Sequence, residues 1–341
     1  MLFPASRKTL LALLADGDFK SGASLAKALA LSRTGVWNRM RELKAIGLEF
    51  TAISGKGYRL IRPLELLDET AIRSGLSPAV QALIPCLDLH DELDSTNTHL
   101  LGLAATASPN AGTVCLAEFQ TAGRGRIGRV WQSPFGGNIF LSLLWWFEDH
   151  TAFAGLSLAV GVAIVRALRL AGVDGITLKW PNDILWQGKK LGGILVEVSG
   201  ETHGRYAVVI GIGLNIHIPA QQAAAIDQAW ADLAEITAGK PPSRNRLIAL
   251  LLNELIPLLA DYPERGLRAY LDEWRQAHSH VGQPAALHIG DKIIKGKVLG
   301  VNDAGLLMLD CAADGIKTFA SGDLRLRTET GTASPLPPIT G

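Results

Sequence analysis

Turn signals interrupt the apolar stretch 176–200, ITLKWPNDILWQGKKLGGILVEVSG, at WPND and again at QGKK. Short apolar segments that are bounded by turn residues predict strands joined by tight connections. Apolar segments at 112–119, 137–147 and 205–216 predict further strands, and the second of these is apolar on both faces, which indicates a central position. Together with a helix predicted at 156–171, the pattern indicates an α+β domain with a mixed, mostly antiparallel sheet backed by helices.

The remainder of the chain predicts additional units, since 341 residues exceed one ordinary core and suggest two or three domains. The segment SRNRLIALLLNELIPLLADYPERGLRAYLDEWRQAH predicts two helices that separate at Pro263. After residue 279, short strand-like segments alternate with Gly, Asp and Asn turns, which predicts a small barrel of SH3-like size. The final segment is rich in Pro and Thr and is expected to be disordered.

The N-terminal segment 1–62 is strongly basic. It carries eleven Lys and Arg against four Asp and Glu, a net charge of +7, whereas the whole chain carries +1. A basic head on a mildly acidic body indicates that the head meets a polyanion. Its sequence predicts three helices and then a small hairpin that turns at 54–57, which is the pattern of a winged helix-turn-helix.

The third predicted helix of this head has one apolar and one polar, basic face. We expect Lys56 and Arg59 to contact phosphates, and Arg33, Thr34 and Asn38 to read base edges. The alternative is a three-helix interaction domain with a solvated charged face. The candidate DNA-contacting residues are Ser32, Arg33, Thr34, Trp37, Asn38, Arg41, Lys56 and Arg59.

A loop in the body, TAGRGRIGRVWQSPFGGN (121–138), combines three arginines with one tryptophan and no acidic side chain. Its Gly123-x-Gly125-x-x-Gly128 pattern matches a dinucleotide fingerprint, but no helical period follows, so the context of that fingerprint is missing. A flexible, solvated basic loop is the alternative. Backbone N–H groups exposed by glycine, forked guanidinium donors and the flat face of Trp131 favour a loop that orders over an anionic ligand.

Two further features favour ligand binding. Three small polar residues at 95–97 stand at a predicted helix start, where they can cap the helix or bind a polar ligand head. Lys179 and Lys190 flank tight turns inside apolar strands, where an unpaired ammonium is costly. For Lys189 two interpretations stay open: an ordinary solvated charge at the end of a hairpin, or a contact with the ligand.

These motifs together resemble the biotin–protein ligases, and the basic winged helix in front resembles the bifunctional class that also represses the biotin operon. The resemblance covers about residues 5–327, and the loop departs from it only in carrying Ile127 at a variable position. The matching motifs are DSTN (94–97), QTAGRGRxGRxW (120–131), KWPND (179–183), KLGGILVE (190–197) and GIGLNI (211–216).

The resemblance implies a division into a winged helix-turn-helix domain, a catalytic domain of the biotin/lipoate ligase type, an SH3-like domain and a disordered tail. The corresponding ranges are 1–63, 64–279, 280–328 and 329–341. It also implies site residues for each step. The biotin-binding residues are Ser95, Thr96, Asn97, Gln120, Arg124, Gly125, Arg126 and Lys190. The nucleotide-binding residues are Trp131, Asn182 and Asn215. The catalytic residues are Arg126, Lys179, Asp183 and Lys190, with Asp183 orienting or deprotonating the incoming lysine.

The implied reaction uses biotin and ATP with Mg²⁺ as substrates and forms biotinyl-5′-AMP, which then biotinylates a lysine of the biotin carboxyl carrier protein. The adenylate would also act as corepressor for operator DNA, bound by a homodimer. A lipoate or octanoate ligase, or a ligand-sensing DNA-binding regulator without ligase activity, is the alternative.

Cysteine usage and hydropathy argue against a disulfide-rich protein, a protein with a cysteine metal cluster and a membrane protein. Three cysteines far apart in the sequence predict neither a disulfide framework nor a metal cluster, and this usage fits the cytoplasm. No apolar run reaches the length of a membrane span, and the N-terminus lacks a signal-peptide cleavage site, so no membrane role is expected.

Overall fold

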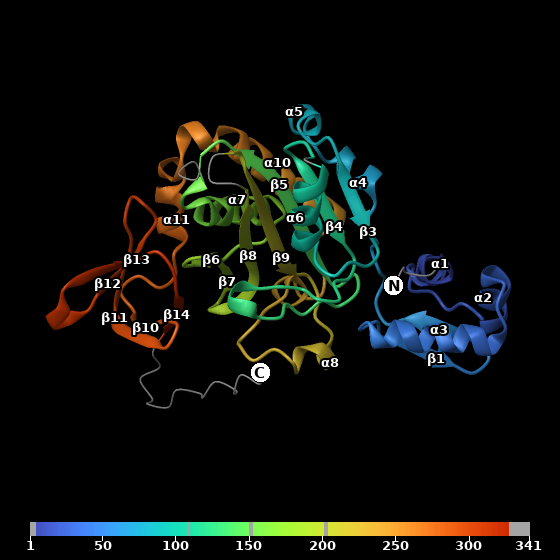
Figure 1. Cartoon of the computed structure of the whole chain (residues 1–341). Helices are drawn as coiled ribbons and strands as arrows, with labels where there is room; N and C mark the ends of the chain where they lie inside the picture. The colour runs from blue at the N-terminus through green and yellow to red at the C-terminus, as the bar shows by residue number, and fades with distance from the viewer. Residues whose placement is uncertain (1–4, 108, 150–152, 201–203, 327–341) are drawn as a thin grey trace.

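The computed structural model describes residues 5–107, 109–149, 153–200 and 204–326, and the tail predicted for 329–341 lies outside them. Three parts lie side by side (Figure 1): the N-terminal head in blue, the central sheet with its helices, and a C-terminal sheet in orange and red. Among the described residues, none of the helices combines the length and apolar character that crossing a membrane requires.

Three helices and a hairpin form the head, as the sequence predicts. The third helix buries Val36, Met40 and Leu43, and the hydroxyl of Ser32 caps it by accepting a hydrogen bond from Gly35 N (3.0 Å). The second helix is capped by Ser21, and Ser24, which lies within its first turn, donates the capping N–H. The elements are α1 (Ala5–Leu14), α2 (Gly22–Leu29), α3 (Arg33–Ala45) and the antiparallel strands β1 (Phe50–Ile53) and β2 (Gly57–Leu60).

The central sheet has seven strands in the order β3-β4-β5-β9-β8-β7-β6. Only β3 and β4 run parallel, and the remaining neighbours are antiparallel, which confirms the mixed, mostly antiparallel sheet. The strands are β3 (Leu87–His90), β4 (Thr113–Ala117), β5 (Asn138–Phe147), β6 (Ile176–Lys179), β7 (Asp183–Trp186), β8 (Lys189–Ser199) and β9 (Tyr206–Asn215). The predicted central strand, β5, lies inside the sheet.

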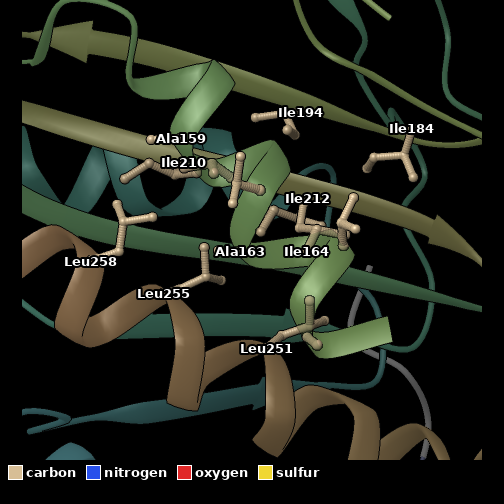
Figure 2. Close-up of a cluster of buried hydrophobic side chains, with 14 of the residues drawn as sticks. Ala159, Ala163, Ile164, Ile184, Ile194, Ile210, Ile212, Leu251, Leu255 and Leu258 are labelled. Carbon is tan, nitrogen blue, oxygen red and sulfur yellow. The ribbon is translucent and has the colours of Figure 1, made fainter. Parts of the chain in front are cut away.

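Helices cover both faces of this sheet because its interior strands are apolar on both sides. On one face lies α7 (Leu156–Leu170), with α10 (Arg244–Arg265) packed behind it, so that Ala163 and Ile164 stand between the strands and Leu255 (Figure 2). On the opposite face lies α6 (Thr96–Ala107), whose Leu100 and Ala104 pack on β4, β5 and β9. The first turn of α6 therefore stands directly over the sheet.

The two helices predicted for 243–278 are present, but the first ends three residues later than the predicted break at Pro263. Helix α10 continues through Pro263 to Arg265; its buried stripe ends with Leu259 and Tyr262, and residues 263–265 form an exposed last turn. It ends at Gly266, which adopts a positive φ of 56°. The other helices are α4 (Glu69–Ser74), α5 (Pro78–Ala82), α8 (Ala220–Ala223), α9 (Leu233–Ile236) and α11 (Leu271–Ala277).

The C-terminal strands form one antiparallel sheet in the order β13-β12-β11-β10-β14. Within the described residues no ladder joins the edge strands β13 and β14, so the sheet is open, and the closed small barrel expected from the sequence is not formed. Leu287, Val298 and Leu309 belong to the same buried cluster as the central sheet. The strands are β10 (Pro284–Ile289), β11 (Lys292–Val301), β12 (Leu307–Asp310), β13 (Ile316–Phe319) and β14 (Asp323–Leu326).

The head and the central part share packing. Phe135, at the end of the arginine loop, is buried in the head's apolar core, and its N–H donates to Ile46 O (3.1 Å). Nearby, Arg244 and Glu118 form an almost completely buried ion pair with Nη1 and Oε2 2.8 Å apart. The end of the loop is therefore fixed between two parts of the fold.

Candidate active site

A cavity of about 380 Å³ opens on the central sheet, where the first turn of α6, the arginine loop and the ends of β6 to β9 meet. Every site residue that the sequence predicts in the body lines it, although these residues are up to 120 positions apart in the chain. They are Ser95, Thr96, Asn97, Gln120, Arg124, Gly125, Arg126, Trp131, Lys179, Asn182, Asp183, Lys190 and Asn215.

One end of the cavity is a buried network of uncharged polar groups. Gln120 Oε1 accepts hydrogen bonds from Thr96 N (2.8 Å) and from its hydroxyl (3.2 Å). Ser142 Oγ lies 2.7 Å from Thr96 Oγ1 and 2.6 Å from Asn97 Oδ1. A Cβ atom at Gly211 would lie 2.2 Å from Asn97 Oδ1, so only glycine fits there. These groups suit a ligand head rich in hydrogen-bond donors and acceptors.

An acidic residue of β8 closes this network. Glu197 accepts from Asn97 Nδ2 (2.9 Å) and pairs with Arg124, whose guanidinium also contacts the Thr98 hydroxyl (3.3 Å). Neither Glu197 nor Ser142 was singled out from the sequence. An acidic side chain at the end of the apolar KLGGILVE segment was the available signal for Glu197, whereas a serine inside an apolar strand gives little.

Arg126 reaches into the cavity from the short 3-10 turn Arg126–Gly128. Its Nη1 donates to Asn182 Oδ1 (3.2 Å), while Asn182 Nδ2 donates to Ile194 O (2.8 Å). Burial lowers the pKa of the Arg126 guanidinium, although Asp183 nearby opposes this shift. Because arginine stays charged even so, the cavity contains a partly desolvated cation that an anionic ligand would neutralise.

A carboxylate stands between two lysines on the floor of the cavity. Lys190 Nζ lies 2.7 Å from Asp183 Oδ1, and Lys179 Nζ lies 3.4 Å from Asp183 Oδ2. Burial alone would raise the pKa of Asp183, but the charges of Lys190 and Lys179 outweigh it and hold that pKa below its usual value. Asp183 is therefore ionised, and it orients the two ammonium groups better than it accepts a proton.

Trp131 lies flat against the sheet because two glycines leave room for it. The ring atoms would be 3.3 Å from a Cβ atom at Gly193 and 2.7 Å from one at Gly213. Lys190 Nζ lies over the ring, 5.5 Å from its centroid. The indole thus offers a flat face beside a cation, and its Nε1 is buried without a hydrogen-bond partner in the described part of the chain.

Asn215 has a supporting geometry. Its side chain is buried, and Nδ2 donates to the carbonyls of Ala231 (3.1 Å) and Lys190 (3.4 Å). Ala231 directly follows Trp230, which lines the cavity together with residues 225–228. Sequence reasoning missed this segment, because nothing in its composition distinguishes it from an ordinary loop.

The C-terminal sheet also reaches the cavity, through Gly322 and Asp323. Arg129 Nη2 lies 2.5 Å from Asp323 Oδ2, which connects the arginine loop to β14. Burial would raise the pKa of Asp323, but its hydrogen bond with Arg129 and the charge of that guanidinium hold it below the usual value. This contribution was also missed from the sequence.

The predicted DNA-contacting residues lie away from the cavity. Those on α3 and at its start share one exposed face, where the Arg41 guanidinium stacks over the half-exposed Trp37 ring at 4.9 Å. Lys56 lies in the β1–β2 turn and Arg59 on β2, where it stacks over the Phe19 ring at 4.8 Å. The exposed residues of the α3 face are Ser32, Arg33, Thr34, Trp37, Asn38 and Arg41.

Fold and cavity agree with comparisons against known proteins. Residues 89–215 match the model of the Biotin/lipoate A/B protein ligase family, and residues 6–59 match that of an HTH domain. The fold and the site therefore define a ligase domain that is coupled to a helix-turn-helix.

Individual relatives narrow this class. The chain is 39% identical to the bifunctional ligase/repressor BirA of Escherichia coli over 94% of this chain and 96% of that protein. It is 35% identical to BirA of Bacillus subtilis over 94% and 98%. A solved structure of biotin protein ligase from Aquifex aeolicus in complex with biotin and ATP superposes with a TM-score of 0.60 at 28% identity, covering 72% of this chain and 99% of that one. The chain belongs to the bifunctional ligase/repressor family of biotin–protein ligases.

Proposed function

We propose that the chain joins biotin to ATP, giving biotinyl-5′-AMP, and transfers the biotin to one lysine of the biotin carboxyl carrier protein. One observation carries the proposal: a single cavity collects an uncharged polar network at one end, and Arg126, Lys179 and Lys190 beside a flat indole at the other. The first part suits a ureido ring, and the second suits a carboxylate, phosphates and a purine.

In the first step an oxygen of the biotin carboxylate attacks the α-phosphorus of Mg-ATP, and pyrophosphate leaves. We assign Arg126 and Lys190 to the carboxylate and the α-phosphate, where positive charge offsets the charge that develops on the phosphoryl oxygens. Trp131 stacks on adenine, while Asn182 and Asn215 hold the nucleotide side of the cavity in shape. No covalent enzyme intermediate is required, so catalysis is positioning and electrostatic stabilisation.

In the second step the amine of the carrier lysine attacks the acyl carbon of the adenylate, and AMP leaves. The incoming amine loses a proton in this step. The pKa of Asp183 lies below its usual value, which makes Asp183 a poor base. We therefore assign Asp183 to holding Lys179 and Lys190 in place, and these in turn orient the incoming amine. Solvent or the departing phosphate takes the proton of the amine.

We further propose that the arginine loop is a lid over the adenylate. Ile127 is three-quarters exposed and has a φ of 56°, a region that costs a branched residue about 1–3 kcal/mol. Val130 is equally exposed. A bound adenylate would cover both side chains and offset this cost, so the loop should become resistant to limited proteolysis when biotin and ATP are added. Equal cleavage rates with and without them would refute the lid.

The experiment that tests the ligase function is incubation of the protein with ATP and either biotin or lipoate, followed by mass spectrometry of the acyl-adenylate. A lipoate ligase needs a long apolar tunnel, whereas Asn97, Thr96 and Gln120 supply hydrogen bonds. Biotinyl-adenylate alone is expected. Lipoyl-adenylate, or no adenylate at all, would overturn the assignment in favour of a lipoate ligase or of a regulator without ligase activity.

A second function, repression of the biotin operon, is favoured by the exposed face of α3 with its basic wing. We propose that the eight head residues named above contact operator DNA. We also propose that the protein acts in the cytoplasm, where free thiols such as those of its three cysteines persist. One +7 head would bind one half-site weakly, and two heads in a homodimer would bind two. Biotinyl-5′-AMP would act as corepressor by ordering the loop and promoting that dimer.

Analytical ultracentrifugation with and without biotinyl-5′-AMP, paired with operator binding, tests this coupling. The ligand should shift the protein toward dimers and tighten DNA binding together.

We also propose the domain ranges 1–63, 64–279 and 280–328, and that the last of these domains is related to SH3 domains. A truncated chain of residues 64–326 that folds and forms adenylate would support the first boundary.

A further inference from the structure

A cluster of side chains with metal-binding chemistry lies outside the cavity, between the edge of the sheet and α6. Strand β3 alternates as Leu87-Asp88-Leu89-His90, so Leu87 and Leu89 face the main core while Asp88 and His90 face α6. In the parallel register Asp88 pairs with Cys115 of β4, which places the thiol on that same face. His99 reaches the cluster from α6.

The ligand atoms of these residues converge. One donor atom from each of Asp88, His90, His99 and Cys115 lies within 4.8 Å of all the others. Asp88 Oδ2 is 2.8 Å from His90 Nε2 and 2.9 Å from His99 Nε2, and the two imidazole ring centroids are 4.8 Å apart. The Cys115 thiol is fully buried, whereas the other three side chains retain about a quarter to a third of their exposure, which leaves an entry path from solvent.

Not every one of these ligand atoms has a hydrogen-bond partner within the described part of the protein. His90 Nε2 is buried and, in the described part of the chain, has no aligned hydrogen-bond partner in spite of its closeness to Asp88. A buried ring nitrogen without a partner costs free energy. Coordination to a cation would satisfy this nitrogen and would also separate the Asp88 carboxylate from two competing imidazoles.

We propose that Asp88, His90, His99 and Cys115 form a binding site for one divalent transition-metal ion of the Zn²⁺ class. A thiolate, two imidazoles and a carboxylate are borderline-soft donors, which suit Zn²⁺ and Co²⁺ and not Mg²⁺ or Ca²⁺. Tetrahedral coordination at about 2.0–2.3 Å needs donor separations of roughly 3.3–3.8 Å. The donor atoms now lie within 4.8 Å of one another, so the most distant of them must move closer on binding, and Cys115 releases its thiol proton to solvent.

A metal ion at this site would stabilise the position of α6, whose first turn forms the polar end of the cavity. His99 N donates to Ser95 O (3.0 Å), so the ligand on α6 lies one turn from the residues Ser95, Thr96 and Asn97. A metal ion shared by His99, β3 and β4 would fix the distance between α6 and the sheet edge. This inference concerns metal binding and stability, and it stands or falls independently of the ligase assignment.

The test uses the full-length protein, freed of metal with a chelator and titrated with Co²⁺ and then with Zn²⁺. We expect one Co²⁺ per chain, with the intense d–d bands of a tetrahedral ion and a sulfur-to-cobalt charge-transfer band that Zn²⁺ abolishes. Zn²⁺ should also raise the Tm, since an ion that binds only the folded state stabilises it.

Two variants and two matched controls sharpen this test. Cys115→Ser should lose the charge-transfer band, and His99→Ala should weaken Co²⁺ binding by at least about tenfold. Cys311→Ser and His288→Ala, which change the same residue types in the C-terminal sheet, should behave as the wild type. Circular dichroism checks that each variant folds, and His99→Ala, on a part-exposed helix position, keeps the test available if Cys115→Ser does not fold.

The proposal fails if the wild type binds no more Co²⁺ than His99→Ala, if its bound Co²⁺ shows no sulfur charge transfer, or if Zn²⁺ raises the Tm of the wild type and of His99→Ala equally. Any of these results would leave the cluster as two histidines beside the Asp88 carboxylate, with His99 hydrogen-bonded to it.

Discussion

Replacing Gly213 by alanine tests whether Trp131 is the nucleotide platform. The added Cβ atom would lie 2.7 Å, 2.9 Å and 3.0 Å from three atoms of the indole ring. Carbon atoms pack at about 3.5–4.0 Å, so the ring must retreat by roughly 1 Å. Gly213 lies in β9, which is held by hydrogen bonds on both sides, whereas Trp131 lies in a loop; the loop should therefore move and the sheet should not.

The size of the effect follows from what the ring contributes. Stacking of a base on an aromatic side chain is worth about 1–3 kcal/mol. Loss of most of that contact predicts a KM for ATP raised by roughly 5- to 150-fold. The KM for biotin should change far less, since the polar network around Thr96 and Asn97 is untouched. Thermal unfolding should stay close to that of the wild type.

Pyrophosphate release measured against ATP and biotin concentrations provides the assay. Gly102→Ala is the matched control, because a Cβ atom there meets nothing within 4 Å and the position is exposed on α6. Trp131→Ala should match the loss in Gly213→Ala, and the double variant should lose no more than either single one. An unchanged KM for ATP in Gly213→Ala, or additive losses in the double variant, would refute the platform.

Other predictions address the charged groups. Lys190→Ala should slow adenylate formation by about 10²–10³-fold with the fold retained, as followed by pyrophosphate release; a wild-type rate would remove Lys190 from catalysis. Arg126→Gly should let adenylate escape and label unrelated proteins, which a biotin blot would detect. Arg244→Met should cost about 3–5 kcal/mol in denaturant unfolding by stranding the buried Glu118, and Met at both positions should recover most of it. Because the pKa of Asp183 is lowered, its stabilising contribution is complete at neutral pH and lost as the pH falls through that pKa. Asp183→Asn should therefore flatten the acid side of a Tm–pH profile.

The local sequence predicted the structure correctly wherever interactions between residues close in the chain determine the conformation. The turns at WPND and QGKK set the hairpins of β6, β7 and β8, and the spacing of Val36, Met40 and Leu43 set the buried side of α3. Local rules were less reliable where packing competed with them. Pro263 does not stop α10, whose buried stripe, ending at Tyr262, packs the preceding turns against the core; the helix ends only at Gly266.

Only the tertiary structure decided how the motifs combine. Sequence placed Asp183 in a turn, but its two lysine partners, and hence its low pKa, depend on the pairing of β7 with β6 and β8. Likewise, the contact of Trp131 with Gly213 joins a loop to a strand more than eighty positions away.

The residues that sequence reasoning missed share a physical reason. Ser142, Glu197 and Asp323 are ordinary side chains in their own segments. Asp323 lines the cavity, and Ser142 and Glu197 hydrogen-bond to Thr96 and Asn97, which line it, only because of strand order and sheet packing. Periodicity and turn chemistry report on neighbours along the chain. A site made from several distant segments depends instead on long-range register, which no local pattern encodes.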